Sequence, residues 1–170
     1  FIKDFEPIFQ RYYEIVSGTN ETVSIEYNST LHEKSYDVLL RESIEHDKYS
    51  TYTNMGIHKD DFIYLIDNHQ VKHYASQGQQ KSFVVAVKLA QFDFNHKKIG
   101  HKPILLLDDI FDKLDDNRVS QLVKLVGNDH FGQVFITDTQ MQRIKYLMEN
   151  SVVNYNIFKV EKGIITSEDE

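Results

Sequence analysis

Residues 104–116 read I-L-L-L-D-D-I-F-D-K-L-D-D, so four large aliphatic residues run directly into two aspartates. A short apolar run after Pro103 is typical of a parallel strand that is buried on both faces. Ligands of parallel α/β sheets bind at the carboxyl ends of the strands. Asp108 and Asp109 would lie there, where one carboxylate can hold Mg²⁺ beside a phosphate and its neighbour can orient an attacking water. The alternative is that both are solvated loop acids or caps of the next helix.

The segments on either side of this strand alternate between helical and strand periodicity, which predicts an α/β fold with parallel pairing in the C-terminal half. Residues 62–66 and 71–74 are expected to form a hairpin around residues 67–70. The expected helices are 4–16, 35–47, 78–98, 117–126 and 140–148, and the other strands are 22–27, 104–107, 134–136 and a closing hairpin over 155–166.

Length and composition exclude several classes of protein. The chain has 170 residues, of which 41% are hydrophobic, and this is enough for the core of one domain. The formal net charge of −7 means that any nucleic-acid surface must be a local patch. Without cysteine there are no disulfides and no thiolate zinc sites. No apolar run approaches the roughly 18 residues of a membrane helix, and the N-terminus lacks a signal peptide and an initiator Met. A cytoplasmic piece of a longer protein is therefore expected.

A phosphate-binding loop of the G-x-x-x-x-G-K-[ST] type is absent from the sequence. The best match in spacing, Gly127 to Gly132, is followed by Gln133 and Val134 and precedes a strand, so we reject it. A second candidate is the stretch Y-A-S-Q-G-Q-Q-K at 74–81, which opens the longest expected helix. Ser76 is a good N-cap, Gly78 allows close approach, and a helix N-terminus suits a phosphate. Ordinary capping is the alternative.

The order of these segments resembles that of the ABC-type ATPases, in the branch that includes SMC proteins and RecF. A-S-Q-G-Q-Q-K resembles the signature motif, I-L-L-L-D-D resembles Walker B, and Leu114-Asp115 resembles the D-loop. M-G-I-H-K-D-D-F at 55–62 and F-G-Q-V-F-I-T-D-T at 131–139 narrow the resemblance to the RecF family. It covers nearly the whole chain, which would correspond to the C-terminal half of a RecF protein.

The resemblance implies a C-terminal lobe of an ABC-type ATPase head, with a mostly parallel sheet flanked by helices and hairpins and with the N-terminal Walker A lobe absent. Residues 1–50 would lead from the RecF-type arm, and residues 51–170 would form the lobe. The implied activity is a DNA-binding ATPase in DNA replication, recombinational repair and the SOS response. It would dimerise around ATP on single-stranded DNA and duplex junctions, hydrolyse ATP for release, and work with RecR and RecO. The 170 residues alone would be inactive.

The family motifs also imply residue roles. Asp108 would position Mg²⁺ on ATP, and Asp109 would be the catalytic carboxylate that polarises water. Asp138 follows Thr137 at the switch position, where most ABC ATPases have a histidine. The signature residues would face the ATP of the opposite subunit; these are Ser76, Gln77, Gly78 and Gln79. Leu114 and Asp115 would form the D-loop, from which Asp115 would cross the dimer interface.

Several alternatives stay open on the sequence. The acidic cluster could belong to a self-contained Mg²⁺-dependent phosphatase or nuclease, and the chain could be a non-catalytic dimerisation module. Lys97, Lys98 and Lys102 are candidates for DNA contact, or they form a solvated loop. The segment containing His58, Asp60 and Asp61 is more typical of a turn before a strand than of a metal site. Asp112 and Asp116 are expected to solvate a helix N-terminus.

Overall fold

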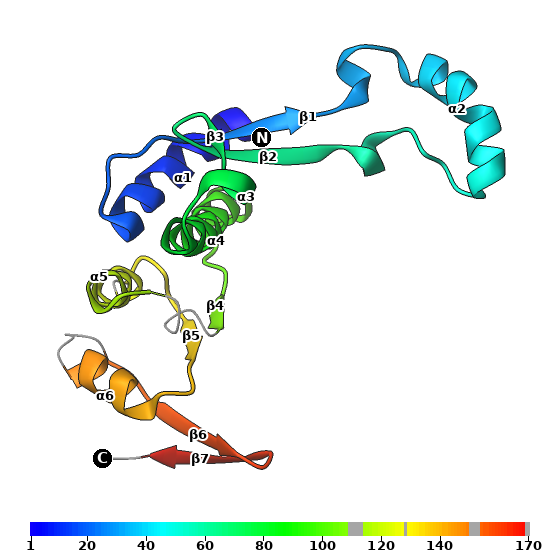
Figure 1. Cartoon of the computed structure of the whole chain (residues 1–170). Coiled ribbons are helices and arrows are strands. Elements are labelled where there is room, and N and C mark those ends of the chain that lie inside the picture. Colours follow the sequence, from blue (N-terminus) through cyan, green and yellow to red (C-terminus); the bar gives the residue numbers. More distant parts are fainter. Residues whose placement is uncertain (109–113, 128, 150–153, 169–170) are drawn as a thin grey trace.

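The computed structural model describes residues 1–108, 114–127, 129–149 and 154–168 (Figure 1). The helices are α1 (Ile2–Ser17), α2 (Tyr36–Ser50), α3 (Val71–Tyr74), α4 (Gln77–Ile99), α5 (Asp116–Val126) and α6 (Met141–Glu149). The strands are β1 (Val23–Asn28), β2 (Asp61–Ile66), β3 (His69–Gln70), β4 (Leu105–Asp108), β5 (Val134–Thr137), β6 (Ile157–Glu161) and β7 (Ile164–Glu168). Most of the predicted elements are thus confirmed to within a few residues.

Within the described ranges the strands form three small sheets. The predicted parallel pairing in the C-terminal half is confirmed for β4 and β5, whose register places Leu105 beside Val134 and Asp108 beside Thr137. The other pairs, β1 with β2, β2 with β3, and β6 with β7, are antiparallel. Parallel pairing therefore accounts for a smaller part of the strand pairing than the resemblance implied.

The prediction of a strand over residues 71–74 is wrong, because these residues form the short helix α3. Asp67 and Asn68 have φ values of 47° and 64°, so they make a tight two-residue turn of the hairpin type. The returning strand begins at once, at His69, and it pairs for two residues only. The hairpin is real, but its turn is shorter and its second strand earlier than the sequence suggested.

Strand β4 is buried on one face, not on both. Leu105 and Leu107 are 5% and 3% exposed, whereas Leu106 is 67% exposed. Phe135, the register partner of Leu106, is also exposed, at 48%. Side chains alternate between the two faces of a strand, and in the described part of the chain only one face of the β4–β5 pair is covered. Asp108 and Thr137 lie on the open face, in register with each other.

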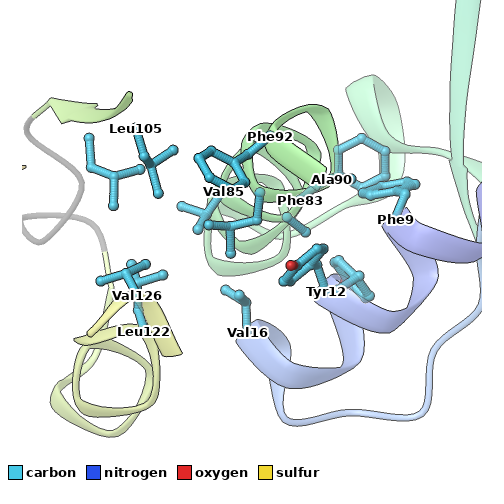
Figure 2. Packing of buried hydrophobic residues seen from close by; sticks show 14 of the residues in the cluster. Phe9, Tyr12, Val16, Phe83, Val85, Ala90, Phe92, Leu105, Leu122 and Val126 are labelled. Carbon is cyan, nitrogen blue, oxygen red and sulfur yellow. The ribbon is translucent and has the colours of Figure 1, made fainter. Parts of the chain in front are cut away.

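The core is built mainly between α1 and α4. The buried side of α1, which has helical spacing, carries Phe9, Tyr12 and Val16, and Figure 2 shows it facing α4. The rings of Phe9 and Phe83 meet edge to face, with centroids 4.7 Å apart. Leu105 of β4 and Leu122 and Val126 of α5 extend the same cluster (Figure 2). Helix α1 and the C-terminal half thus share one core.

One carboxylate is buried inside this packing. Asp93 of α4 is 4% exposed and accepts hydrogen bonds from Arg11 Nη2 at 2.9 Å and from Tyr12 Oη at 2.8 Å. His130 Nε2 lies 2.5 Å from its other oxygen. Burial, together with the hydrogen bond to Asp93, raises the pKa of Tyr12. The carboxylate therefore ties α1 and α4 to the loop before β5, and it is paired as a buried charge must be.

Strands β1 and β2 continue beyond the core as a two-stranded arm that carries α2 at its far end (Figure 1). The turn back into β2 contains Gly56, whose φ of 133° favours glycine. In the described ranges no helix is both long enough and apolar enough to cross a membrane.

Candidate functional site

The start of α4 has a fully formed cap. The hydroxyl of Ser76 accepts a hydrogen bond from the backbone N–H of Gln79 at 3.2 Å. In return, Oε1 of Gln79 accepts one from the N–H of Ser76 at 2.8 Å, which completes a capping box. The first N–H groups of a helix have no intrahelical acceptor, so those of Gln77 and Gly78 stay available to a ligand. Capping and anion binding are therefore compatible at this helix start.

A carboxylate that the sequence analysis missed holds the same turn from the loop after α1. Glu21 accepts hydrogen bonds from Gln79 Nε2 at 2.7 Å, from Tyr13 Oη at 2.8 Å and from Thr19 Oγ1 at 2.8 Å. Burial raises the pKa of this carboxyl, but the three hydrogen bonds and the positive charge of Arg118 outweigh it, so the net pKa is lowered. Glu21 is therefore charged at neutral pH and fixes the Gln79 side chain.

Arg118 is the second residue that the sequence analysis missed. Asp115 caps α5 by accepting a hydrogen bond from the N–H of Arg118 at 3.0 Å. Its other oxygen lies 3.3 Å from Arg118 Nε. The guanidinium also reaches α4, because Arg118 Nη1 lies 3.0 Å from the position that a Cβ on Gly78 would occupy. One arginine thus pairs with the predicted D-loop and lies against the predicted signature turn, which are far apart in the sequence.

A second group of predicted residues meets at the carboxyl ends of β4 and β5. Asp108 accepts a hydrogen bond from the hydroxyl of Thr137, its register partner. Asp138 accepts one from the N–H of Gln140 at 2.5 Å, and its other oxygen is buried with no hydrogen-bond partner among the described residues. Asp109 and Asp112 lie outside the described residues, as does the side chain of Asp116.

The basic residues after α4 lie apart from these contacts. Lys97 and Lys98 are exposed in the last turn of α4, and Lys98 Nζ sits 5.4 Å from the centre of the Phe94 ring. Lys102 donates to the backbone carbonyl of Asp129. Lysines in the last turn of a helix also complement the helix dipole. Their position therefore fits a solvated helix end as well as it fits DNA contact.

The segment around His58 forms a turn, as the sequence favours. His58 Nε2 lies 2.8 Å from the carbonyl oxygen of Thr53, and Asp60 accepts a hydrogen bond from the hydroxyl of Tyr27. Across the residues that the structure describes, no three His, Asp or Glu side chains are grouped to hold a metal ion.

Comparison with known proteins decides which family this arrangement belongs to. No family model matches the chain. The DNA replication and repair protein RecF of Flavobacterium johnsoniae is 47% identical over 160 residues, which cover 94% of this chain. RecF of Bacteroides fragilis is 45% identical over all 170 residues. The chain belongs to the RecF family. It spans about 45% of the length of these RecF relatives.

Solved structures give the same result for the fold. A structure of the recombination mediator protein RecF-ATPrS in the RecFOR pathway matches with a TM-score of 0.71 and 28% identity, covering 98% of this chain and 44% of that RecF chain. An SMC ATPase structure matches with a TM-score of 0.56 at 12% identity, which supports the fold alone. The predicted fold class, a partial ABC-type ATPase lobe, is confirmed.

Proposed function

We propose that the chain is the C-terminal lobe of a RecF-type ATPase that acts in DNA replication, recombinational repair and the SOS response. ATP would drive its dimerisation on DNA, and hydrolysis would drive release. The identity of 47% to a RecF protein over nearly the whole chain supports the family role. The observation that carries the proposal is the contact of Arg118 with both Asp115 and the start of α4, because it brings signature and D-loop segments together.

The start of α4 would face the nucleotide held by a second subunit. Free N–H groups and the positive end of the helix dipole favour a phosphate there. Ser76, Gln77, Gly78 and Gln79 would supply this surface. Asp115 of the D-loop would cross the dimer interface, while its neighbour Leu114, 5% exposed, anchors the segment in the core. The capping box fixes Ser76 and Gln79 before any ligand arrives, which reduces the entropic cost of binding.

The carboxyl ends of β4 and β5 fit a magnesium nucleotide. The carboxylate of Asp108 and the hydroxyl of Thr137 are the hard oxygen donors that Mg²⁺ prefers, and both lie on the open face of the sheet. Asp108 would hold the ion, Asp109 would orient the attacking water, and Thr137 and Asp138 would occupy the switch position. Mg²⁺ neutralises phosphate charge in phosphoryl transfer. A Walker A loop, which would hold the phosphates, is expected from an N-terminal lobe.

The binding partners and the cellular location that we propose are those expected for a RecF protein. Exposed Lys97 and Lys98, with Lys102, would contact the phosphates of single-stranded DNA or duplex junctions. RecR and RecO would be protein partners, in the cytoplasm. Residues 1–50 would lead in from the arm, with α1 packed on the lobe formed by residues 51–170.

The self-contained phosphatase or nuclease has less support. The identity of 47% to a RecF protein over 94% of the chain favours the RecF-type ATPase instead.

The decisive experiment replaces Ser76 by Arg in the full-length protein. A long charged side chain at the subunit contact should abolish ATP-dependent dimerisation in sedimentation. Nucleotide affinity of the monomer should stay unchanged, because the subunit's own ATP site lies elsewhere. Ser76→Ala, which removes only the cap, should cost about 1 kcal/mol of stability. Gln91→Arg, at an exposed position of the same helix, is the matched control. A stable ATP-dependent dimer of Ser76→Arg would show that this segment is only a cap.

A further inference from the structure

Arg118 occupies a position that links two otherwise separate segments. Its side chain is 24% exposed, so the guanidinium is partly removed from water. It contacts Asp115 through Nε and reaches Gly78 through Nη1. Asp115 precedes α5 and Gly78 lies in the first turn of α4, so a single side chain spans the gap between the two helix starts.

The contact also explains why position 78 is a glycine. Gly78 is not among the glycines with positive φ, so its backbone conformation does not require the missing side chain. The nearest atom to a Cβ built there is Arg118 Nη1, at 3.0 Å. A side chain at position 78 would crowd the guanidinium, whose flexible end would have to shift.

The charged groups around the first turn of α4 also support a role for Arg118 at this turn. The carboxylate of Glu21 holds Gln79, one residue further along α4, and Arg118 contributes to keeping that carboxylate charged. Two charged groups therefore act on the first turn of α4: the Glu21 carboxylate through Gln79, and the Arg118 guanidinium beside Gly78. An arginine suits this role because its planar group can contact two partners at fixed angles, whereas a lysine presents a single mobile charge.

We propose that Arg118 is a positioning residue that sets the D-loop, at Asp115, and the signature turn, at Gly78, in the relative orientation that a second subunit's nucleotide requires. This inference rests on the proposed function. It assigns to Arg118 no contact with nucleotide. Without the guanidinium, each segment keeps its own cap, from Ser76 in α4 and from Asp115 in α5, and both helices keep their core packing, but the link between the two helix starts is lost.

The test uses the full-length protein with Arg118→Gln and Arg118→Lys. Sedimentation with ATP should show dimerisation weakened by about tenfold in both variants, the size expected for the loss of one charge-assisted contact. Nucleotide affinity of the monomer should stay within about twofold of wild type, because the contact acts between subunits. Lys124→Gln removes a cation from an exposed position of the same helix and should dimerise normally.

Three results would overturn the inference. One is normal dimerisation of Arg118→Gln when the wild type dimerises with ATP. Another is full rescue by Arg118→Lys, because a single charge would then suffice. The third is an equal loss of monomer nucleotide affinity and of dimerisation, together with a lower melting temperature, which would mean general damage to the fold. A wild type that fails to dimerise with ATP would instead remove the proposed function itself, and the inference with it.

Discussion

Gly78 and Arg118 show how one residue's identity can depend on a side chain far away in the sequence. Gly78 is the second residue of α4, and glycine is a weaker helix former than alanine. The local backbone does not explain the glycine, because Gly78 does not adopt the left-handed conformation that favours glycine. The glycine instead leaves room for Arg118, whose Nη1 lies only 3.0 Å from the position that a Cβ would occupy.

Gly78→Ala should therefore separate stability from assembly. The new methyl group would push the flexible end of Arg118 aside, so the free energy of unfolding should change by less than about 1 kcal/mol. ATP-dependent dimerisation should weaken as it does for Arg118→Gln. Sedimentation and urea unfolding of the single and double variants would measure both effects.

The double variant Gly78→Ala with Arg118→Gln provides the control. If both changes act through the same contact, the pair should dimerise no worse than either single variant. If the losses of dimerisation in the two single variants add in full in the double variant, this explanation is contradicted. Gly78 would then have a separate role at the surface that faces the nucleotide.

At the scale of elements, α4 connects the core to the site. One side packs against α1, where Ala86, Leu89 and Ala90 are fully buried. Its first turn carries the predicted signature, and its last turns hold Asp93 and the exposed lysines. The core packing of this helix thus sets where its N-terminus lies.

Leu89→Ala should destabilise the protein by about 2–5 kcal/mol, because it leaves a cavity in the core around α4. Urea unfolding followed by circular dichroism would measure the loss. Val84→Ala is the matched control on the same helix, since Val84 is 58% exposed and its truncation should cost about 0.5 kcal/mol or less. Equal losses for the two variants would contradict the packing described for α4.

At the scale of the whole molecule, the chain carries only one part of the proposed ATPase. It contains a Walker B-like strand and a signature-like turn, but none of its 170 residues forms a G-x-x-x-x-G-K-[ST] loop. Its open face on β4 and β5 carries the exposed apolar side chains of Leu106 and Phe135 beside Asp108.

The 170 residues alone should therefore show no measurable ATP turnover, since nothing in them would hold the β- and γ-phosphates. A steady-state assay with Mg²⁺ and ATP would test this, with an Asp109→Asn version as the control for contaminating ATPases. Turnover of about 1 s⁻¹ or more that Asp109→Asn abolishes would contradict the proposal and would revive the self-contained enzyme.

The sequence by itself determined the order and type of nearly all elements, the Ser76 cap and the parallel pair that ends at Asp108. These features depend on periodicity, capping residues and apolar runs, which act over a few neighbouring residues. The order of the motifs resembles that of the RecF family, and the comparisons confirm this family.

Only the tertiary structure decided the rest. The local pattern of residues 71–74 suggested a strand, but the tight turn at Asp67 and Asn68 ended the pairing early. The apolar run of β4 suggested two buried faces, yet burial depends on which elements cover the sheet, and in the described part of the chain one face is covered. The contacts of Glu21 with Gln79 and of Arg118 with Gly78 arise because packing brings distant segments together, and no local pattern encodes that proximity.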